Sequence, residues 1–99
     1  MSLDIGLRRH DTFNVTHNLT PMWIKANIYE CLYKSEGKKA KEIINQLEKG
    51  LQDIKDNYNE YKKLNPSNGW GDIDGAIEFL ERVIKEFKQY PNAKIEVWK

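Results

Sequence analysis

Hydrophobic and polar residues alternate at both ends of the chain, which is the pattern of β-strands. Near the N-terminus, apolar residues alternate with polar ones over 3–7 and again over 13–17. A turn at residues 9–11 would join these two segments into a hairpin. The same alternation returns over 93–97. Three short strands form a stable sheet only if helices cover one face. As a separate expectation, the last strand returns to the hairpin and lies beside the first strand.

Between these ends, apolar residues recur every three or four positions, which is the pattern of amphipathic helices. A first helix is predicted from Thr20-Pro21, a strong start signal, to about Tyr33. The clearest stripe predicts a second helix over 38–56, with a bend near Asn57 before another turn or two. Gly50 interrupts this stripe at a cost of about 1 kcal/mol against Ala, so we expect a close backbone approach there.

The last helix is predicted to start after Asp72, a good N-cap residue, and to end before Pro91. The order of elements predicts an α+β fold. Its small antiparallel sheet, made of the N-terminal hairpin and the C-terminal strand, would pack against three to four helices. A length of 99 residues predicts a single domain spanning 1–99.

Charge and composition narrow the choice of partners. The chain has 16 basic and 15 acidic residues, a net charge of +1, which does not favour a nucleic acid polymer or an anionic membrane as partner. No apolar run reaches the 18 or so residues that a membrane span requires. The single cysteine, Cys31, lies in an apolar helical pattern and cannot form an internal disulfide. We therefore expect a cytoplasmic protein.

Catalytic and metal-binding patterns are not recognisable in this sequence. It has neither a P-loop nor a dinucleotide-binding fingerprint. His10 and His17 are seven residues apart, about 20 Å if the chain between them is extended. No local context suggests a Ser-His-Asp or Cys-His system. We therefore expect no enzymatic activity, no metal and no cofactor.

An unusual loop separates the last two predicted helices. Its sequence is Asn65-Pro66-Ser67-Asn68-Gly69-Trp70-Gly71-Asp72. Trp70 would either plug the core beneath the last helix or form a stacking platform, which is worth about 1–3 kcal/mol per base in single-strand binders. In the second case Asn65 and Asn68 would fix polar groups of a ligand, and the Gly69 amide would approach it closely.

A second polar cluster lies on the second predicted strand. Asn14, Thr16 and Asn18 alternate along it, so they share one face. Their amides and hydroxyl supply donors and acceptors without charge. This row would either recognise a base or ribose edge or face water on the outer side of the sheet. Arg8, Arg9 and His17, in and around the hairpin, are the candidates for contacting a phosphate.

Two further tryptophans are candidates for the core or for a binding surface. Trp23 follows the first helix start, where it would be buried or would border the site. Trp98 falls on the polar phase of the last strand. An exposed indole there would form an oligomer contact or a pocket edge, or would simply lie on the surface.

These motifs resemble those of a group of small uncharacterised phage and prophage proteins. The resemblance rests on Asn14-x-Thr16-x-Asn18, Met22, Ile28-Tyr29-Glu30 and the Asn-Pro-x-Asn-Gly-Trp-Gly loop, and it covers roughly residues 12–98. Tyr33 departs from it, because members often carry Trp at this position. The resemblance implies a phage origin and no particular chemistry. By analogy with other small phage proteins, it suggests a sponge that sequesters a nucleotide signal of bacterial immunity.

The sequence thus predicts a phage-encoded, non-enzymatic, homo-oligomeric protein that sequesters a small nucleotide-like ligand in the cytoplasm of an infected bacterium. The predicted ligand-binding residues are Arg8, Arg9, Asn14, Thr16, His17, Asn18, Trp23, Asn65, Asn68, Gly69 and Trp70. One alternative is an interaction module that inhibits a host defence protein. Another is a small nucleotide-acting enzyme that uses His17 or Asp72. The ligand-binding prediction requires segments 14–18 and 65–71 to line one concavity.

Overall fold

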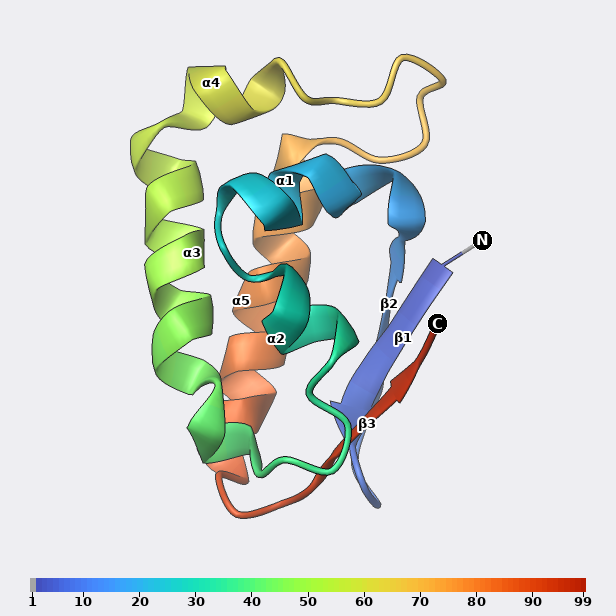
Figure 1. The fold of residues 1–99 in the computed structure, drawn as a ribbon, viewed down its shortest axis with the longest axis vertical. Helices are drawn as coiled ribbons and strands as arrows, with labels where there is room; N and C mark the ends of the chain where they lie inside the picture. Colours follow the sequence, from blue (N-terminus) through green and yellow to red (C-terminus); the bar gives the residue numbers. More distant parts are fainter. Residues whose placement is uncertain (1) are drawn as a thin grey trace.

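The computed structural model describes residues 2–99, and the chain passes through two strands, a run of helices and a final strand (Figure 1). The strands are β1 (Ser2–Leu7), β2 (Thr12–Thr16) and β3 (Ile95–Trp98). The α-helices are α1 (Thr20–Lys25), α2 (Tyr29–Tyr33), α3 (Ile44–Asp56), α4 (Tyr58–Lys62) and α5 (Ile73–Gln89), and the short 3-10 helices are η1 (His17–Leu19) and η2 (Ala40–Glu42). This arrangement confirms the predicted α+β fold.

The three strands form an antiparallel sheet in the order β2-β1-β3, so the first and last strands are neighbours, as expected. Ile5 lies opposite Phe13 on one side and Val97 on the other. Successive side chains of a strand point to opposite faces, so these apolar residues share the inner face. The outer face carries Ser2, Asp4, Thr12, Asn14, Thr16, Glu96 and Trp98.

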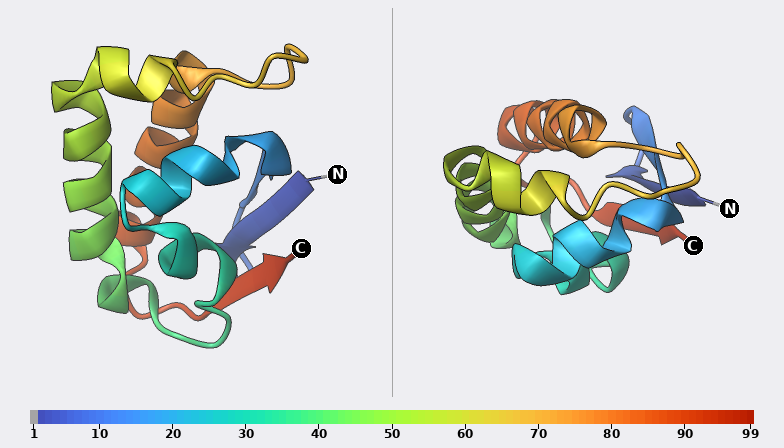
Figure 2. Two further views of the ribbon diagram at one scale, coloured as in Figure 1. Left: turned by 45° about the horizontal axis from the view of Figure 1, so that its top comes forward. Right: turned by 90° about the horizontal axis from the view of Figure 1, so that it is seen from above.

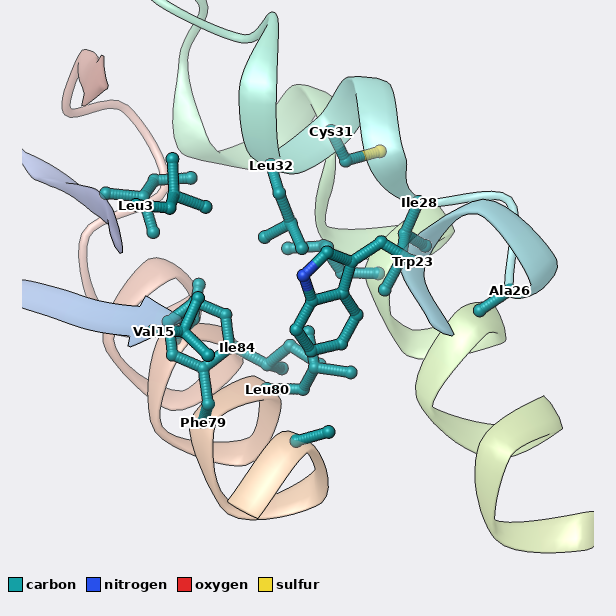
Figure 3. Close-up of a cluster of buried hydrophobic side chains, with 14 of the residues drawn as sticks. Leu3, Val15, Trp23, Ala26, Ile28, Cys31, Leu32, Phe79, Leu80 and Ile84 are labelled. Atoms are coloured by element: carbon teal, nitrogen blue, oxygen red, sulfur yellow. The ribbon is translucent and has the colours of Figure 1, made fainter. Parts of the chain in front are cut away.

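Helices cover the inner face of the sheet. Seen from above, α5 lies on one side of the core and α1 and α2 lie on the other (Figure 2). Trp23 is fully buried between these layers, among side chains from β1, α2 and α5 (Figure 3). Each such buried apolar side chain contributes about 1.5–3 kcal/mol. Within residues 2–99, no helix combines the length and apolar character needed to cross a membrane.

Gly50 lies where α3 packs against the turn that follows α1. A Cβ atom at this position would clash with Cγ2 of Ile28 and lie 3.2 Å from the carbonyl oxygen of Ala26. The close backbone approach predicted from Gly50 is therefore confirmed, and it is a packing contact between the helix and residues 26–28.

The single helix predicted over 20–33 was wrong, because the chain turns sharply at Asn27. This residue has a φ of 60°, a left-handed conformation that Asn tolerates better than most residues. The Ile28 amide donates to the Trp23 carbonyl at 2.9 Å, which closes the turn. The side chain of Gln46 holds it from α3 by donating to the Asn27 carbonyl at 2.6 Å. The two short helices α1 and α2 result.

The predicted start of the second helix at residue 38 was also wrong, because α3 begins at Ile44. The amides of Ala40 and Lys41 donate to the carbonyls of Ala93 and Pro91, at 3.0 and 2.9 Å. These bonds hold the segment alongside the chain that enters β3, so tertiary pairing overrides the helical pattern. The bend predicted near Asn57 is present, since this residue separates α3 from α4.

Candidate functional site

The loop between α4 and α5 crosses the top of the molecule toward the η1 end of β2 (Figure 1). Two asparagines shape it: the Asn68 Oδ1 accepts a hydrogen bond from the Trp70 amide, and the Asn65 Oδ1 accepts one from the Ile73 amide, each at 2.9 Å. Gly69 turns the chain with a φ of 78°. The Trp70 side chain is 68% exposed, so the alternative in which it plugs the core is wrong.

Gly71 brings the loop against the end of β2. Its φ of 103° favours glycine, and a Cβ there would lie 2.8 Å from Cγ2 of Thr16 and 3.2 Å from Cγ of Leu19. Only a residue without a side chain lets the two segments approach this closely. The glycine therefore fixes the position of the neighbouring indole relative to the strand.

A pocket of about 500 Å³ lies where the loop meets the sheet. Its lining residues are Ser2, Asn14, Thr16, Asn18, Asn68 and Trp70. Segments 14–18 and 65–71 therefore line one concavity, as the ligand-binding prediction requires. Ser2 was missed, although its pairing with Thr16 across the hairpin places it on the same outer face. Ligand binding itself stays a prediction.

Hydrogen bonds within the pocket wall orient its amides. The Asn14 Nδ2 donates to the Ser2 Oγ and to the Asp4 Oδ1, each at 2.9 Å. The Thr16 Oγ1 accepts from the backbone amide of Asn18 at 3.2 Å and from its Nδ2 at 3.1 Å. In the described part of the chain, the Oδ1 atoms of Asn14 and Asn18 keep their acceptor capacity. The wall is thus ordered before any ligand arrives.

Arg8 and Arg9 do not belong to this pocket, which corrects the prediction that they contact a phosphate there. They lie in the turn after β1, whereas Ser2 at the pocket begins that strand. Six residues of extended strand separate the turn from the pocket by about 20 Å. The Arg8 Nε instead lies 3.5 Å from the Glu96 Oε2, in an exposed ion pair.

His17 also points away from the pocket, so its predicted ligand contact was wrong. Its Nδ1 lies 2.8 Å from the Tyr33 hydroxyl, within hydrogen-bonding distance, and the two rings pack with centroids 5.6 Å apart. Burial raises the pKa of the Tyr33 hydroxyl, so Tyr33 stays neutral at physiological pH. The pair links η1 to α2.

Three further predicted ligand contacts are also corrected. Trp23 is fully buried in the core and cannot touch a ligand in the pocket. The Asn65 side chain is engaged at the start of α5 and does not line the cavity. Gly69 shapes the loop beside the pocket without lining it.

The residues named for an enzymatic alternative have structural partners. The Asp72 Oδ1 caps α5 by accepting from the Gly75 amide at 2.7 Å, and His17 is engaged with Tyr33. Cys31 is buried, and burial raises the pKa of its thiol above the usual range. Within residues 2–99, no group of three or more His, Cys, Asp or Glu side chains could hold a metal ion.

The chemistry of the pocket is neutral. Within residues 2–99, the six lining side chains are uncharged, and the Asp4 carboxylate, which bonds to Asn14, lies beside it on the same face of the sheet. Hydroxyls and carboxamides offer both donors and acceptors, and the exposed indole offers a flat apolar face. This combination suits a ligand that has a ring and several uncharged polar groups.

Comparison with protein-family models, curated proteins and solved structures finds no match for the chain. The resemblance to phage and prophage proteins stays a prediction from the motifs. Function is accordingly inferred from the geometry of the pocket.

Proposed function

We propose that this chain is a non-enzymatic binding protein for a small nucleoside-like ligand. The base stacks on Trp70, and its edge and the ribose hydrogen-bond to Asn14, Thr16, Asn18 and Asn68. One observation carries this proposal: two segments some fifty residues apart meet in a pocket with an exposed indole on one side and ordered amides on the other.

The neutral wall specifies which part of a nucleotide is recognised. A phosphate group needs Arg, Lys or several aligned amides to replace its hydration, and among residues 2–99 no basic side chain lines the pocket. The phosphates of a bound nucleotide therefore remain in solvent. Nucleosides should bind about as well as their phosphorylated forms, which revises the expectation of an Arg-bound phosphate.

The proposed biological role is sequestration in the cytoplasm of an infected bacterium. A protein that holds a nucleotide signal without converting it lowers the free concentration of that signal. The resemblance to phage proteins suggests this role. The role requires binding of a nucleotide without catalysis, as proposed above.

Isothermal titration against a nucleoside panel tests the binding proposal. The panel contains adenosine, guanosine, cytidine and uridine, their monophosphates, ADP-ribose and cyclic dinucleotides. Trp70→Ala should weaken binding by about 1–3 kcal/mol, or roughly 5- to 150-fold. The indole is exposed, so stability should change by less than about 0.5 kcal/mol.

Trp98→Ala is the matched control, because it removes another exposed indole, 51% exposed, that does not line the pocket. It should leave ligand affinity unchanged. No heat with any ligand at high protein concentration would contradict the proposal. Equal losses in both variants would contradict the assignment of the pocket.

A protein-interaction module is the second candidate function. It is favoured by the open outer face of the sheet, where the exposed Trp98 lies opposite Asp4. In that case a host defence protein would bind without any small ligand. Binding of that partner would be lost in Trp98→Ala and kept in Trp70→Ala, the reverse of the result expected for the pocket.

A further inference from the structure

The two edge strands of the sheet differ in whether another segment of the chain bonds to their outer edge. The outer edge of β3 is closed: the Ile95 amide donates to the Lys38 carbonyl, the Gly37 amide donates to the Ile95 carbonyl, and the Val97 amide donates to the Glu36 Oε1, at 2.7–2.8 Å. By contrast, within residues 2–99, the backbone of β2 bonds to no segment other than β1. An unpaired edge is a template for another strand.

The sequence of β2 lacks the devices that usually protect such an edge. Its five residues, Thr12-Phe13-Asn14-Val15-Thr16, include no charge and no proline. Two copies of this strand can therefore lie antiparallel without like-charge repulsion. With Asn14 at the centre, Thr12 of each copy faces Thr16 of the other, and Thr–Thr pairs are favourable across strands.

A groove of about 360 Å³ runs along this edge, with α5 as its second wall. Its lining residues are Thr12, Phe13, Asn14, Gly75, Glu78, Phe79 and Arg82. Glu78 and Arg82 are exposed on the helix and form an ion pair at 2.5 Å. The α5 wall therefore presents one acidic and one basic side chain side by side.

Glu78 and Arg82 lie at equal distances on either side of the height of Asn14, so a two-fold axis through Asn14 would bring opposite charges together. The Asp11 amide lies 3.4 Å from the Glu86 Oε2, so these two residues are at the same height along the strand. From this point β2 and α5 lie alongside each other, with residue numbers rising along β2 and falling along α5. Three strand residues span about 10 Å, which equals about six to seven helical residues. Asn14 is thus level with residues 79–80, the midpoint between Glu78 and Arg82.

We propose that two copies of this chain associate through β2 into a continuous six-stranded antiparallel sheet, with the two α5 helices side by side. The axis through Asn14 sets Glu78 of each copy opposite Arg82 of the other. An isologous contact requires this kind of self-complementarity. Thr12 of the partner then lies beside Thr16 at the rim of the ligand pocket, so the two pockets open on one face of the dimer.

Charge exchange on α5 tests this arrangement. Sedimentation equilibrium from micromolar to millimolar concentration should give the wild type twice the 11.7 kDa mass of one chain. Glu78→Arg or Arg82→Glu replaces both intermolecular pairs with repulsion, and each should raise the dimer dissociation constant about tenfold or more. The double variant E78R/R82E restores complementarity, so it should dimerise like the wild type.

Both residues are exposed, so the variants should fold, and circular dichroism checks this. A wild type that stays monomeric at all concentrations would overturn the proposal. So would single variants that dimerise as tightly as the wild type, or a double variant that fails to recover. Loss of the dimer in Trp98→Ala would instead assign the contact to the outer face of the sheet.

Discussion

Gly71 joins the loop to the sheet, and its side-chain hydrogen sets the distance between them. Gly71→Ala would push a methyl group into Thr16 and Leu19 at a φ that disfavours any side chain. We expect a loss of about 1–3 kcal/mol in the free energy of unfolding. Ligand affinity should fall as well, because the indole of Trp70 shifts with the loop. Urea denaturation and ligand titration measure the two effects.

Gly69→Ala is the control for this prediction. Gly69 also has a positive φ, of 78°, but a Cβ there meets nothing within 4 Å. The cost should be limited to the left-handed conformation, about 1 kcal/mol. If both variants lost equal stability and affinity, contact with the strand would not be what positions Trp70.

A hydrogen bond between two side chains links α3 to α4 beside their junction at Asn57. The Tyr61 hydroxyl donates to the Asp53 Oδ2, and the Tyr61 ring is fully buried. Burial, followed by the bond to this carboxylate, raises the pKa of the Tyr61 hydroxyl well above its usual range. The folded chain therefore keeps this proton at a pH where the unfolded chain releases it.

Tyr61→Phe should consequently change how stability depends on pH. At neutral pH the variant should lose about 1 kcal/mol through the missing bond. Above the unfolded pKa of about 10, the unfolded state binds fewer protons, so wild-type stability falls as pH rises. The variant lacks this contribution, so the two stabilities should converge toward about pH 11. Denaturant titrations at neutral and alkaline pH measure this, and parallel curves would contradict it.

At the level of elements, regular spacing in the sequence was enough to predict the strands and the long helices. The period-two alternation predicted all three strands, the apolar stripe predicted α5, and Asp72 as an N-cap residue predicted where it starts. The errors lie at Asn27 and at residues 38–43. In both places the conformation depends on partners far along the chain, Gln46 in one case and Pro91 and Ala93 in the other. Local pattern does not contain that information.

For the whole molecule, five of the six residues that line the pocket could be predicted from the sequence, whereas the charged residues assigned to the site lie outside it. Asn14, Thr16 and Asn18 share a face by strand periodicity, and the loop composition singled out Asn68 and Trp70. Arg8 and Arg9 were assigned by charge alone, yet the length of β1 separates them from the pocket. His17 was assigned to a strand, and the start of η1 turns its ring toward Tyr33.

Chemical-shift mapping of the side-chain N–H groups tests the central claim most directly. The chain has three tryptophans, and each indole gives its own signal in a ¹⁵N-correlated spectrum. During titration with the nucleoside that binds best, the Trp70 indole and the amides of Asn14, Asn18 and Asn68 should shift together and saturate. The signals of Trp23 and Trp98 should stay in place. Shifts centred on Trp98, or no shift at any of the pocket residues, would contradict a ligand site between the loop and the sheet.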